Sequence, residues 1–421
     1  MLTHRKAIKE ISRHTFALKP KFLPLSRCLD KVLAKTLSSP IPFPNFDNSA
    51  VDGYAIRFKK KVVILSEAKD LASRFFGLRP QNDDPVQHTT FHVQGEIAAG
   101  EFFSGTLKPG HAMQIFTGAP VPRGTDAVIM QEQTERQNGS VNILKPPRFK
   151  ENIRFQGEDF RKNSTLVKAG TRLEPAHLAL AATAGCDKIS VYPWPRVAIL
   201  VTGNELLNPG QKILPGKIYD SNTVFLEALV KKAGGAPFIL PRIKDNLRKS
   251  IAAIRKGLEY DVLIVAGGVS VGKYDFVKEA LKKEGVKEIF WKVNIKPGKP
   301  LYFGKKKKTL VFGLPGNPVS VFVTFEEFVK PALLKMSGQD IGPKWVQGVL
   351  KSEFKNGFRP HFVRVRYFQQ KGNSMIEPLK GQGSHQVASL AKANALMKVK
   401  AGQTLGAGQT VKAKIILGGM P

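Results

Sequence analysis

Apolar runs alternate with amphipathic stretches through the middle of the chain, from Arg196 to about Gly338. Short and almost wholly apolar runs predict buried strands in "RVAILVTG", "FILPRI", "DVLIVAGG", "EIFWKVNI" and "TLVFGLPG". Polar and apolar residues at helical spacing predict helices in "SNTVFLEALVKKAGG", "NLRKSIAAIRKGLE", "YDFVKEALKKEG" and "NPVSVFVTFEEFVKPALLKMSG". Strands that alternate with helices predict a doubly wound parallel sheet, whose ligand site lies beyond the carboxyl ends of the strands.

The two flanks of this region have different patterns. Near the start, "THRKAIKEISRHTF" and "LSRCLDKVLAKTL" predict two helices, which stop at the proline-rich "SSPIPFPNF". From Phe46 to about Leu144, short strands and many turns predict a mainly β domain. After Met336, "VQGVLKSEF", "FVRVRYFQQ" and "QTVKAKIIL" predict a small β barrel or sandwich. Four structural regions therefore fit the pattern.

One segment does not fit the β pattern of the second region. The basic stretch from Lys59 to Phe91 has no clear period and interrupts the predicted strands. We interpret it as an insertion that forms an exposed loop.

Charge narrows the classes of partner. The 66 Lys and Arg residues against 33 Asp and Glu residues give a net charge of +33, which favours polyanionic partners such as nucleic acid or a phosphorylated substrate. The basic residues are spread along the chain, and the dense run Lys305–Lys308 lies between two strand-like segments. A solvated hairpin tip is the favoured interpretation of this run, and a dedicated nucleic-acid contact is the alternative.

Other sequence features argue against a membrane protein and against a disulfide-stabilised protein. No run of about 18 apolar residues predicts a membrane span, and charges throughout the first residues argue against a signal peptide, so we expect a cytoplasmic protein. The two cysteines cannot form a disulfide framework, and no Cys or His spacing is typical of a zinc site.

Three loops at the ends of predicted parallel strands carry the candidate chemistry. The first, "TGNELLNPG", presents Glu205, which is either a surface acid or a ligand for substrate or metal. The second, "GGVSVGKYD", combines glycines that let the backbone approach a ligand with Ser270 and Asp275. Asp275 is either a ligand or only the N-cap of the next helix. The third, "GLPGNPVS", enters a helix.

A lysine pair lies close to the third loop in sequence. In "KPGKP", Lys296 and Lys299 are held three residues apart by a Pro-Gly turn. They are either surface charges or, if they face a helix N-terminus, an oxyanion site. No Ser-His-Asp or Cys-His arrangement is visible. The candidate side chains are carboxylates, lysines and hydroxyl groups. They indicate a site that binds anions together with a divalent cation, as in phosphoryl-group chemistry.

Taken in order, these motifs resemble the molybdopterin molybdenumtransferase family, which includes MoeA and the E domain of gephyrin. The matching stretches are "FDNSAVDGYAIR", "GEIAAGE", "TGAPVPRGTDAVIMQE", "RFQGED", "PRVAILVTGNEL", "SNTVFL", "GGVSVGKYD", "KPGKP", "GLPGNPVS" and "GQGSHQVASLAKANAL". They run from residue 46 to about residue 396, nearly the whole chain. A set of this length in family order is highly specific.

The resemblance implies a multidomain α/β and β fold in an elongated homodimer. Each subunit would have a helical and extended linking domain (1–45 with 146–193) and a mainly β domain (46–145, with the insertion at about 59–91). A doubly wound, MogA-like α/β domain (194–338) and a C-terminal β barrel (339–421) would follow. The homodimer is the main implied partner. Molybdopterin adenylyltransferase and molybdoenzyme apoproteins are further candidates, and neither a membrane nor a specific nucleic acid is expected.

The resemblance also implies the reaction. Adenylylated molybdopterin would be bound, its phosphoanhydride hydrolysed with Mg²⁺, AMP released, and molybdate inserted into the dithiolene. Molybdate and the diphosphate are anions, so oxyanion binding falls to Lys296, Lys299, Ser320, Arg359, Arg364 and Ser384. The catalytic set is Asp52, Thr117, Asp159, Glu205, Asp245 and Asp275, of which Glu205, Asp245 and Asp275 would hold the metal.

The resemblance assigns the remaining residues to substrate binding. These are Thr202, Gly203, Asn204, Ser221, Asn222, Gly267, Gly268, Ser270, Gly272, Pro315, Gly316 and Asn317. Asp52, Thr117 and Asp159 would line a β-domain wall, which in the family closes on the α/β domain of the other subunit. In "FDNSAVDGYAIR", Asp47, Asn48 and Ser49 would shape a turn from which Asp52 faces the cleft, and a purely structural turn is the alternative.

Three departures from the family pattern are present. His361 stands in "FRPHFVR" where an acid is expected, the insertion follows the first motif directly, and the positive charge is unusually large. Two rival functions remain open. One is the adenylyltransferase of the same pathway, which resembles the α/β domain alone, and the other is a nucleic-acid-binding or scaffold protein on the same fold.

Overall fold

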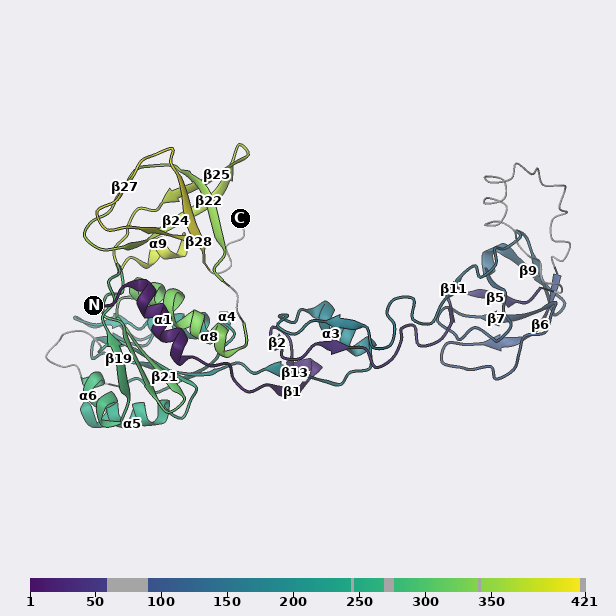
Figure 1. Ribbon diagram of the computed structural model, residues 1–421, viewed down its shortest axis with the longest axis horizontal. Helices are drawn as coiled ribbons and strands as arrows, with labels where there is room; N and C mark the ends of the chain where they lie inside the picture. The colour runs from purple at the N-terminus through teal and green to yellow at the C-terminus, as the bar shows by residue number, and fades with distance from the viewer. Residues whose placement is uncertain (59–89, 244–245, 269–275, 340–341, 417–421) are drawn as a thin grey trace. The chain divides into compact units, whose positions relative to one another are not determined.

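The structure is a computed structural model that describes residues 1–58, 90–243, 246–268, 276–339 and 342–416. The chain forms two compact units (Figure 1). Unit 1 comprises Met1–Lys35, Ala169–Glu174 and Lys188–Pro421, and unit 2 comprises Thr36–Lys168 and Pro175–Asp187. Nearly all of the predicted insertion lies outside the described residues, because only Thr90 and Phe91 of it belong to them.

An α/β sheet forms the centre of unit 1. Its six strands, in spatial order, are β17 (Ala236–Ile239), β14 (Arg196–Val201), β18 (Val262–Ala266), β21 (Thr309–Leu314), β20 (Tyr302–Lys306) and β19 (Lys287–Trp291). The first four pair in parallel, as the sequence predicts. The covering helices are α4 (Asn222–Lys232), α5 (Leu247–Gly257), α6 (Phe276–Lys283), α7 (Pro318–Thr324) and α8 (Lys330–Met336), with the π-helical turn η3 (Phe325–Val329) between the last two.

One edge of the predicted parallel sheet is antiparallel. Strand β20 runs antiparallel to both of its neighbours. Only Lys307 and Lys308 separate β20 from β21, and so short a connection permits a hairpin but no crossover. The basic run is therefore a hairpin turn, as predicted, and Lys305 and Lys306 are already engaged with the His14 carbonyl and with Glu284.

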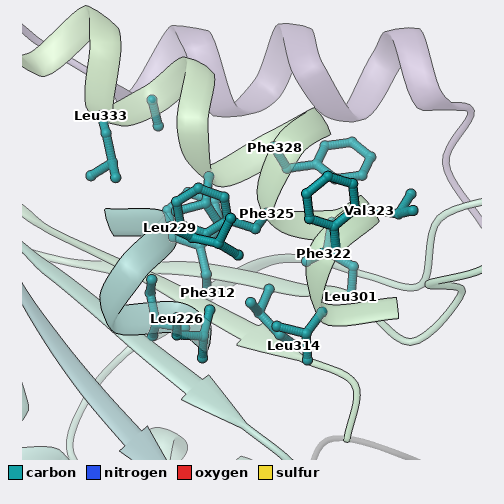
Figure 2. Close-up of a cluster of buried hydrophobic side chains, with 14 of the residues drawn as sticks. Leu226, Leu229, Leu301, Phe312, Leu314, Phe322, Val323, Phe325, Phe328 and Leu333 are labelled. Atoms are coloured by element: carbon teal, nitrogen blue, oxygen red, sulfur yellow. The ribbon is translucent and has the colours of Figure 1, made fainter. Parts of the chain in front are cut away.

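The main core lies between this sheet and the helical run from α7 to α8. Figure 2 shows Phe322 and Phe325 pointing toward side chains of α4 and of the sheet. Helix α1 (His4–His14) packs against η3 and α8 on the outside of this run. Burying a large apolar side chain contributes about 1.5–3 kcal/mol, so this cluster contributes a large share of the stability of unit 1.

A closed β barrel, as predicted, completes unit 1. Its strands, in order around the barrel, are β22 (Trp345–Leu350), β25 (Asn373–Pro378), β24 (His361–Gln370), β26 (Ala395–Val399) and β28 (Thr410–Ile415). The short strands β23 (Phe354–Lys355) and β27 (Thr404–Leu405) pair beside it, and α9 (Val387–Ala391) lies in the connection before β26.

A buried ionic network joins the barrel to the α/β domain. We call it the junction network: Glu326, Glu327, Lys330, Lys414, Lys398 and His4. The Lys414 ammonium lies 2.7 Å from a Glu327 carboxylate oxygen and also donates to the Glu326 carbonyl. Lys330 bonds both carboxylate oxygens of Glu326, whose side chain is fully buried. The network holds helix and barrel together through charges removed from water.

The second predicted helix, over residues 25–37, is wrong. The structure has the 3₁₀ turn η1 (Leu25–Arg27), strand β2 (Val32–Leu33) and strand β3 (Leu37–Ser38) there. Strands β1 (Lys21–Pro24) and β2 both pair with β13 (Lys188–Tyr192), and Asp30 between them has φ 62°. A left-handed residue ends any helix, and pairing with a distant strand overrides the local preference. The first predicted helix is confirmed as α1.

Unit 2 is mainly β. Its sheet has the order β8 (Ala127–Met130), β5 (Gly53–Ile56), β7 (His111–Ile115), β6 (Thr90–Ile97), β10 (Ser140–Ile143) and β9 (Thr134–Gln137). The shorter elements are β4 (Asn48–Ser49), η2 (Gln131–Gln133), β11 (Ile153–Arg154), β12 (Thr165–Val167) and α3 (Pro175–Thr183).

No helix in the described part of the chain has the length and apolar composition needed to cross a bilayer.

Candidate functional site

The three predicted loops begin side by side at the carboxyl ends of adjacent parallel strands, and of the second loop only Gly267 and Gly268 are described. The Thr202 amide donates to the Ala266 carbonyl over 3.0 Å, and the Gly267 amide donates to the Leu314 carbonyl over 3.1 Å. Because the register aligns Val201, Ala266 and Leu314, the residues that follow them form one edge. This edge is where an α/β sheet binds its ligand.

Glycine is required where two of these loops meet. A Cβ on Gly267 would lie 2.6 Å from the Thr202 carbonyl oxygen, and a Cβ on Gly268 would lie 2.7 Å from a Val277 methyl group. Both glycines also have positive φ. The Thr202 hydroxyl is buried here and has no hydrogen-bond partner within the described ranges.

The first loop also places an acid at the edge. The carboxylate of Glu205 lies over Gly203, where a Cβ would be 2.8 Å from both carboxylate oxygens. Glu205 is exposed, and the Asn204 carbonyl accepts a hydrogen bond from Lys217. Four predicted site residues lie outside the described residues: Asp245, Ser270, Gly272 and Asp275. Among the residues that are described, no group of three His, Cys, Asp or Glu side chains could hold a metal.

Helix α4 joins the third loop through one amide. The Asn222 side chain donates to the Gly316 carbonyl over 2.7 Å, and Asn222 is buried. Ser221, which precedes the helix, is exposed, as is Gly316, whereas Pro315 is buried. The hydrogen bond brings the predicted substrate residues of two segments, 221–222 and 315–317, into one place.

The lysine loop lies between the sheet and the barrel. The Lys296 amide donates to the Pro360 carbonyl, and the Phe362 amide donates to the Lys296 carbonyl, each over 2.8 Å. The backbone of Lys296 is thus fixed to the start of β24, while the side chains of Lys296 and Lys299 are exposed. Gly298, at φ 104°, lets the loop pack on α7, because a Cβ there would lie 2.6 Å from a methyl group of Thr324.

The start of α7 meets a loop of the barrel. Ser384 accepts a hydrogen bond from the Asn317 side-chain amide on its hydroxyl (2.8 Å) and one from the Val319 amide on its carbonyl (3.1 Å). Ser320 is buried in the first turn, and its carbonyl oxygen lies 3.7 Å from a Cβ built on Gly298. Ser320, Ser384 and the lysine loop therefore surround the same turn of α7.

Arg364 is fully buried behind this turn. Its Nε donates to the Ser389 hydroxyl (2.9 Å), and its Nη2 donates to the carbonyls of Gly381 (2.6 Å) and Gly383 (3.1 Å). Nη1 is buried and has no partner among the residues that the structure describes. Burial lowers the pKa of Arg364 to about 10, so the guanidinium remains charged at neutral pH.

His361 and Arg359 complete the group. Burial, with the charges of Lys296, Arg364 and Arg359, lowers the pKa of His361 to about 4, so its imidazole is neutral at pH 7. The Arg359 guanidinium donates to the Ile295 carbonyl over 3.4 Å. We name Lys296, Lys299, Ser320, Arg359, Arg364 and Ser384 the oxyanion cluster. Within the described ranges, none of its four cations forms an ion pair with a carboxylate.

Arg364 is a buried charge without an acid partner among the described residues, and such a charge is costly. Lys296, Arg359 and Arg364 are all close enough to His361 to lower its pKa, so these cations also repel one another. A bound anion would remove both costs, and its oxygen atoms would accept the hydrogen bonds that Nη1 and the lysines can still donate.

Unit 2 holds a second group of predicted residues. One carboxylate oxygen of Asp52 accepts hydrogen bonds from the hydroxyl and from the amide of Thr117, each over 2.7 Å. These bonds, that of the hydroxyl first, lower the pKa of Asp52. The carboxylate is therefore ionised and held in one orientation on the surface of unit 2, although both residues are exposed.

The turn before Asp52 has the predicted structural role. A carboxylate oxygen of Asp47 accepts from the Gln156 amide (2.8 Å), and the Ser49 hydroxyl donates to the Val51 carbonyl (2.5 Å). Asp159 is exposed, and its amide donates to the Phe43 carbonyl over 3.1 Å. No hydrogen bond between Asp159 and Asp52 is present among the described residues.

Sequence reasoning missed the residues that hold Arg364. The Ser389 hydroxyl accepts from its guanidinium, and the Gln382 side chain bonds both the amide and the carbonyl of Arg364. Both residues lie in the matching stretch "GQGSHQVASLAKANAL", in which Ser384 is the one predicted site residue. A Ser or Gln in a loop carries no signal of such a role until the loop folds over the arginine.

Comparison with known proteins identifies the family of the chain. Three family models match the chain: "MoeA N-terminal region (domain I and II)" over residues 2–185, "Probable molybdopterin binding domain" over 198–335, and "MoeA C-terminal region (domain IV)" over 347–416. A molybdopterin molybdenumtransferase of Haemophilus influenzae is 33% identical over 419 residues, which cover 96% of this chain and 95% of that protein. The chain belongs to the molybdopterin molybdenumtransferase family.

Further relatives support the assignment. A molybdopterin molybdenumtransferase of Bacillus subtilis is 35% identical over 424 residues, which cover 98% of this chain and 93% of that protein. A crystal structure of a molybdopterin biosynthesis MoeA protein from Pyrococcus horikoshii is similar with a TM-score of 0.77 and 30% identity, over 99% of each chain. As a member of the molybdopterin molybdenumtransferase family, the chain is a transferase of molybdenum cofactor biosynthesis. The predicted family, enzyme class and multidomain fold are confirmed.

Proposed function

We propose that the protein inserts molybdate into adenylylated molybdopterin, in a Mg²⁺-dependent reaction that releases AMP. One observation carries the proposal: Arg364 is buried with Nη1 unpartnered, and none of the four cations of the oxyanion cluster pairs with an acid among the described residues. Molybdate is a tetrahedral oxyanion, and Arg364 can donate to it from Nη1 while its other nitrogens hold the barrel loop. Lys296 and Lys299 add charge from the opposite loop, and Ser320 and Ser384 add hydroxyl groups.

The pterin would lie along the edge of the sheet. Thr202 and Gly267 lie at this edge, and the Asn222–Gly316 hydrogen bond holds helix α4 to the third loop beside it. The family model that matches this part is described as a molybdopterin binding domain. Substrate at the edge of the sheet would then be next to molybdate at the start of α7. Tungstate has nearly the same size and charge as molybdate and would be expected to compete with it.

A magnesium ion fits the donor chemistry of the first loop. Glu205 presents an exposed carboxylate at a strand end, and carboxylate oxygens are the ligands that Mg²⁺ prefers. We assign Glu205, with Asp245 and Asp275 of the sequence, to this ion. When bound, Mg²⁺ neutralises charge on the diphosphate and polarises the anhydride for attack by water.

The direct test is an assay of the purified protein with adenylylated molybdopterin, Mg²⁺ and molybdate. We expect AMP release and the formation of cofactor that activates a molybdoenzyme apoprotein. Absence of both would refute the proposal. Consumption of ATP without molybdate would favour the rival adenylyltransferase. Binding to DNA that persists at moderate salt with a sequence preference would favour the nucleic-acid rival, since a protein of charge +33 binds any polyanion weakly.

We further propose that the active form is a homodimer in which Asp52, Thr117 and Asp159 of one subunit serve the site of the other. The rigid, ionised Asp52 carboxylate is what supports a role beyond turn formation. Co-expression of an Asp52→Ala chain with a Lys299→Ala chain tests this. Each homodimer should be inactive, while the mixed dimer has one complete site and should recover about half of the normal activity per dimer.

The contrary result is equally clear for the dimer proposal. If both sets of residues serve one site within the same chain, the mixed dimer has no more activity than either homodimer.

Two further expectations accompany the dimer: a cytoplasmic location and contacts with molybdopterin adenylyltransferase and molybdoenzyme apoproteins. Fractionation of cells and co-purification from extracts would test them.

A further inference from the structure

The Leu2–His4 segment contacts the backbone that leads into the lysine loop. The Leu2 amide donates to the Lys292 carbonyl over 3.3 Å, and the Leu2 carbonyl accepts from the Asn294 amide over 2.8 Å. Leu2 and Val293 thus form a parallel bridge, two residues before Ile295 and three before Lys296. This single bridge fixes the segment to the stretch that leads into the lysine loop.

The side chain of His4 anchors this segment at both ring nitrogens. Nε2 lies 2.8 Å from a carboxylate oxygen of Glu327, and Nδ1 lies 3.0 Å from the Lys398 ammonium. An ammonium group can only donate, so Nδ1 accepts and the proton is on Nε2, which donates to Glu327. The ring also packs against Phe328 and Phe362, with centroids 5.4 and 5.1 Å away.

These partners belong to the elements that carry the oxyanion cluster. Glu327 lies on the helical run that begins at the turn of Ser320. Phe362 lies on β24, two residues before Arg364, and its amide donates to the Lys296 carbonyl. The segment therefore contacts the elements next to all three parts of the cluster: the backbone before the lysine loop through Leu2, and the helical run and the barrel through His4.

We propose that His4 is a positioning residue that, through the Leu2–His4 segment, fixes the lysine loop relative to Ser320 and Arg364. The role rests on the proposed function, since it sets the geometry of the oxyanion cluster. His4 itself is half-buried in the junction network and is not expected to touch the substrate.

The test measures molybdate binding by equilibrium dialysis, independently of turnover. For His4→Ala we expect about tenfold weaker molybdate binding, the effect of losing about 1.4 kcal/mol. His4→Gln should recover most of the affinity, because its amide can donate to Glu327 and its carbonyl can accept from Lys398. Lys9→Ala, at an exposed position of α1, should have no effect. In turnover, the KM for molybdate should rise in His4→Ala while the KM for adenylylated molybdopterin stays unchanged.

Lys299→Ala serves as the reference for the site itself. If it weakens molybdate binding and folded His4→Ala does not, the positioning role is wrong and the proposed function stands. If Lys299→Ala has no effect on molybdate binding either, the oxyanion cluster does not bind molybdate, and the positioning role of His4 is refuted as well. An equal loss of affinity for both substrates in His4→Ala would show a general structural effect and overturn the inference.

A second variant covers the case in which His4→Ala does not fold. Leu2→Pro removes the amide that donates to Lys292 and leaves the His4 side chain in place. We expect faster amide hydrogen exchange at Asn294 and a several-fold weaker affinity for molybdate. Unchanged exchange and affinity would contradict the proposal.

Discussion

Replacing Arg364 by methionine should weaken molybdate binding by about a hundredfold or more. A hydrogen bond to a charged group contributes about 1.5–3 kcal/mol. Loss of two such bonds, one from each N–H of Nη1, corresponds to at least a hundredfold weaker affinity for molybdate. The variant loses the Nη1 donor and leaves the acceptors on Ser389, Gly381 and Gly383 without their partner. Equilibrium dialysis with molybdate and the KM for molybdate in turnover would measure the loss.

Arg366→Met is a matched control for this variant. Arg366 lies on the same strand two residues along but is exposed, so its loss should leave molybdate binding unchanged. Arg364→Lys separates charge from geometry, because an ammonium cannot reach three acceptors and a ligand as the planar guanidinium does. It should bind molybdate with an affinity between those of Arg364→Met and the unaltered protein. A folded Arg364→Met protein with normal affinity would contradict the assignment.

The second large effect concerns stability. Lys414→Met should destabilise unit 1 by about 3–5 kcal/mol, the usual cost of removing one partner from a buried ion pair. The side chains of Glu326 and Glu327 are 0% and 7% exposed, and both would lose a counter-charge 2.7–3.7 Å away. Calorimetry at pH 7 would show a lower Tm. Lys412→Met, at an exposed position of the same strand, is the matched control and should leave the Tm nearly unchanged.

The same network predicts how stability depends on pH. Burial alone would raise the pKa of Glu327, but the hydrogen bond from His4 and the charge of Lys414 outweigh it, and the pKa is lowered from 4.5 to about 2. A lowered carboxyl pKa stabilises the fold above the unfolded value, and this contribution is lost as the pH falls from about 4.5 toward 2. Calorimetric scans between pH 5 and about 2.5 should show this loss. In Glu327→Gln, where no carboxyl titrates, the slope over this range should be smaller, and an equal slope would contradict the role of Glu327.

Much of the fold could be predicted because its signals are local. The apolar runs of β14, β18 and β21 and the amphipathic periods of α4 and α5 are properties of neighbouring residues, and each element forms where predicted. The loops at the strand ends could be placed together for the same reason, since parallel strands bring their carboxyl ends to one edge. The order of the motifs then identified the family.

Other features depend on partners that are distant in sequence. Residues 25–37 have a helical pattern, yet Val32 and Leu33 pair with a strand more than 150 residues away. Strand β20 is antiparallel because a two-residue turn connects it to β21, which an apolar run does not reveal. His4 reaches Glu327 and Lys398 only because α1 packs beside η3 and the barrel.

The sequence by itself determined the family, the strands and helices of the α/β domain, and the types of residue that bind anions, because these follow from local pattern and residue chemistry. Only the tertiary structure decided which charges are buried and what holds them. Arg364 and Arg366 look alike in sequence, but one is enclosed by the barrel loop and the other is exposed. Burial arises from long-range packing, so local pattern could not show that Arg364 is enclosed without an acid partner among the described residues, and the proposed oxyanion site depends on that burial.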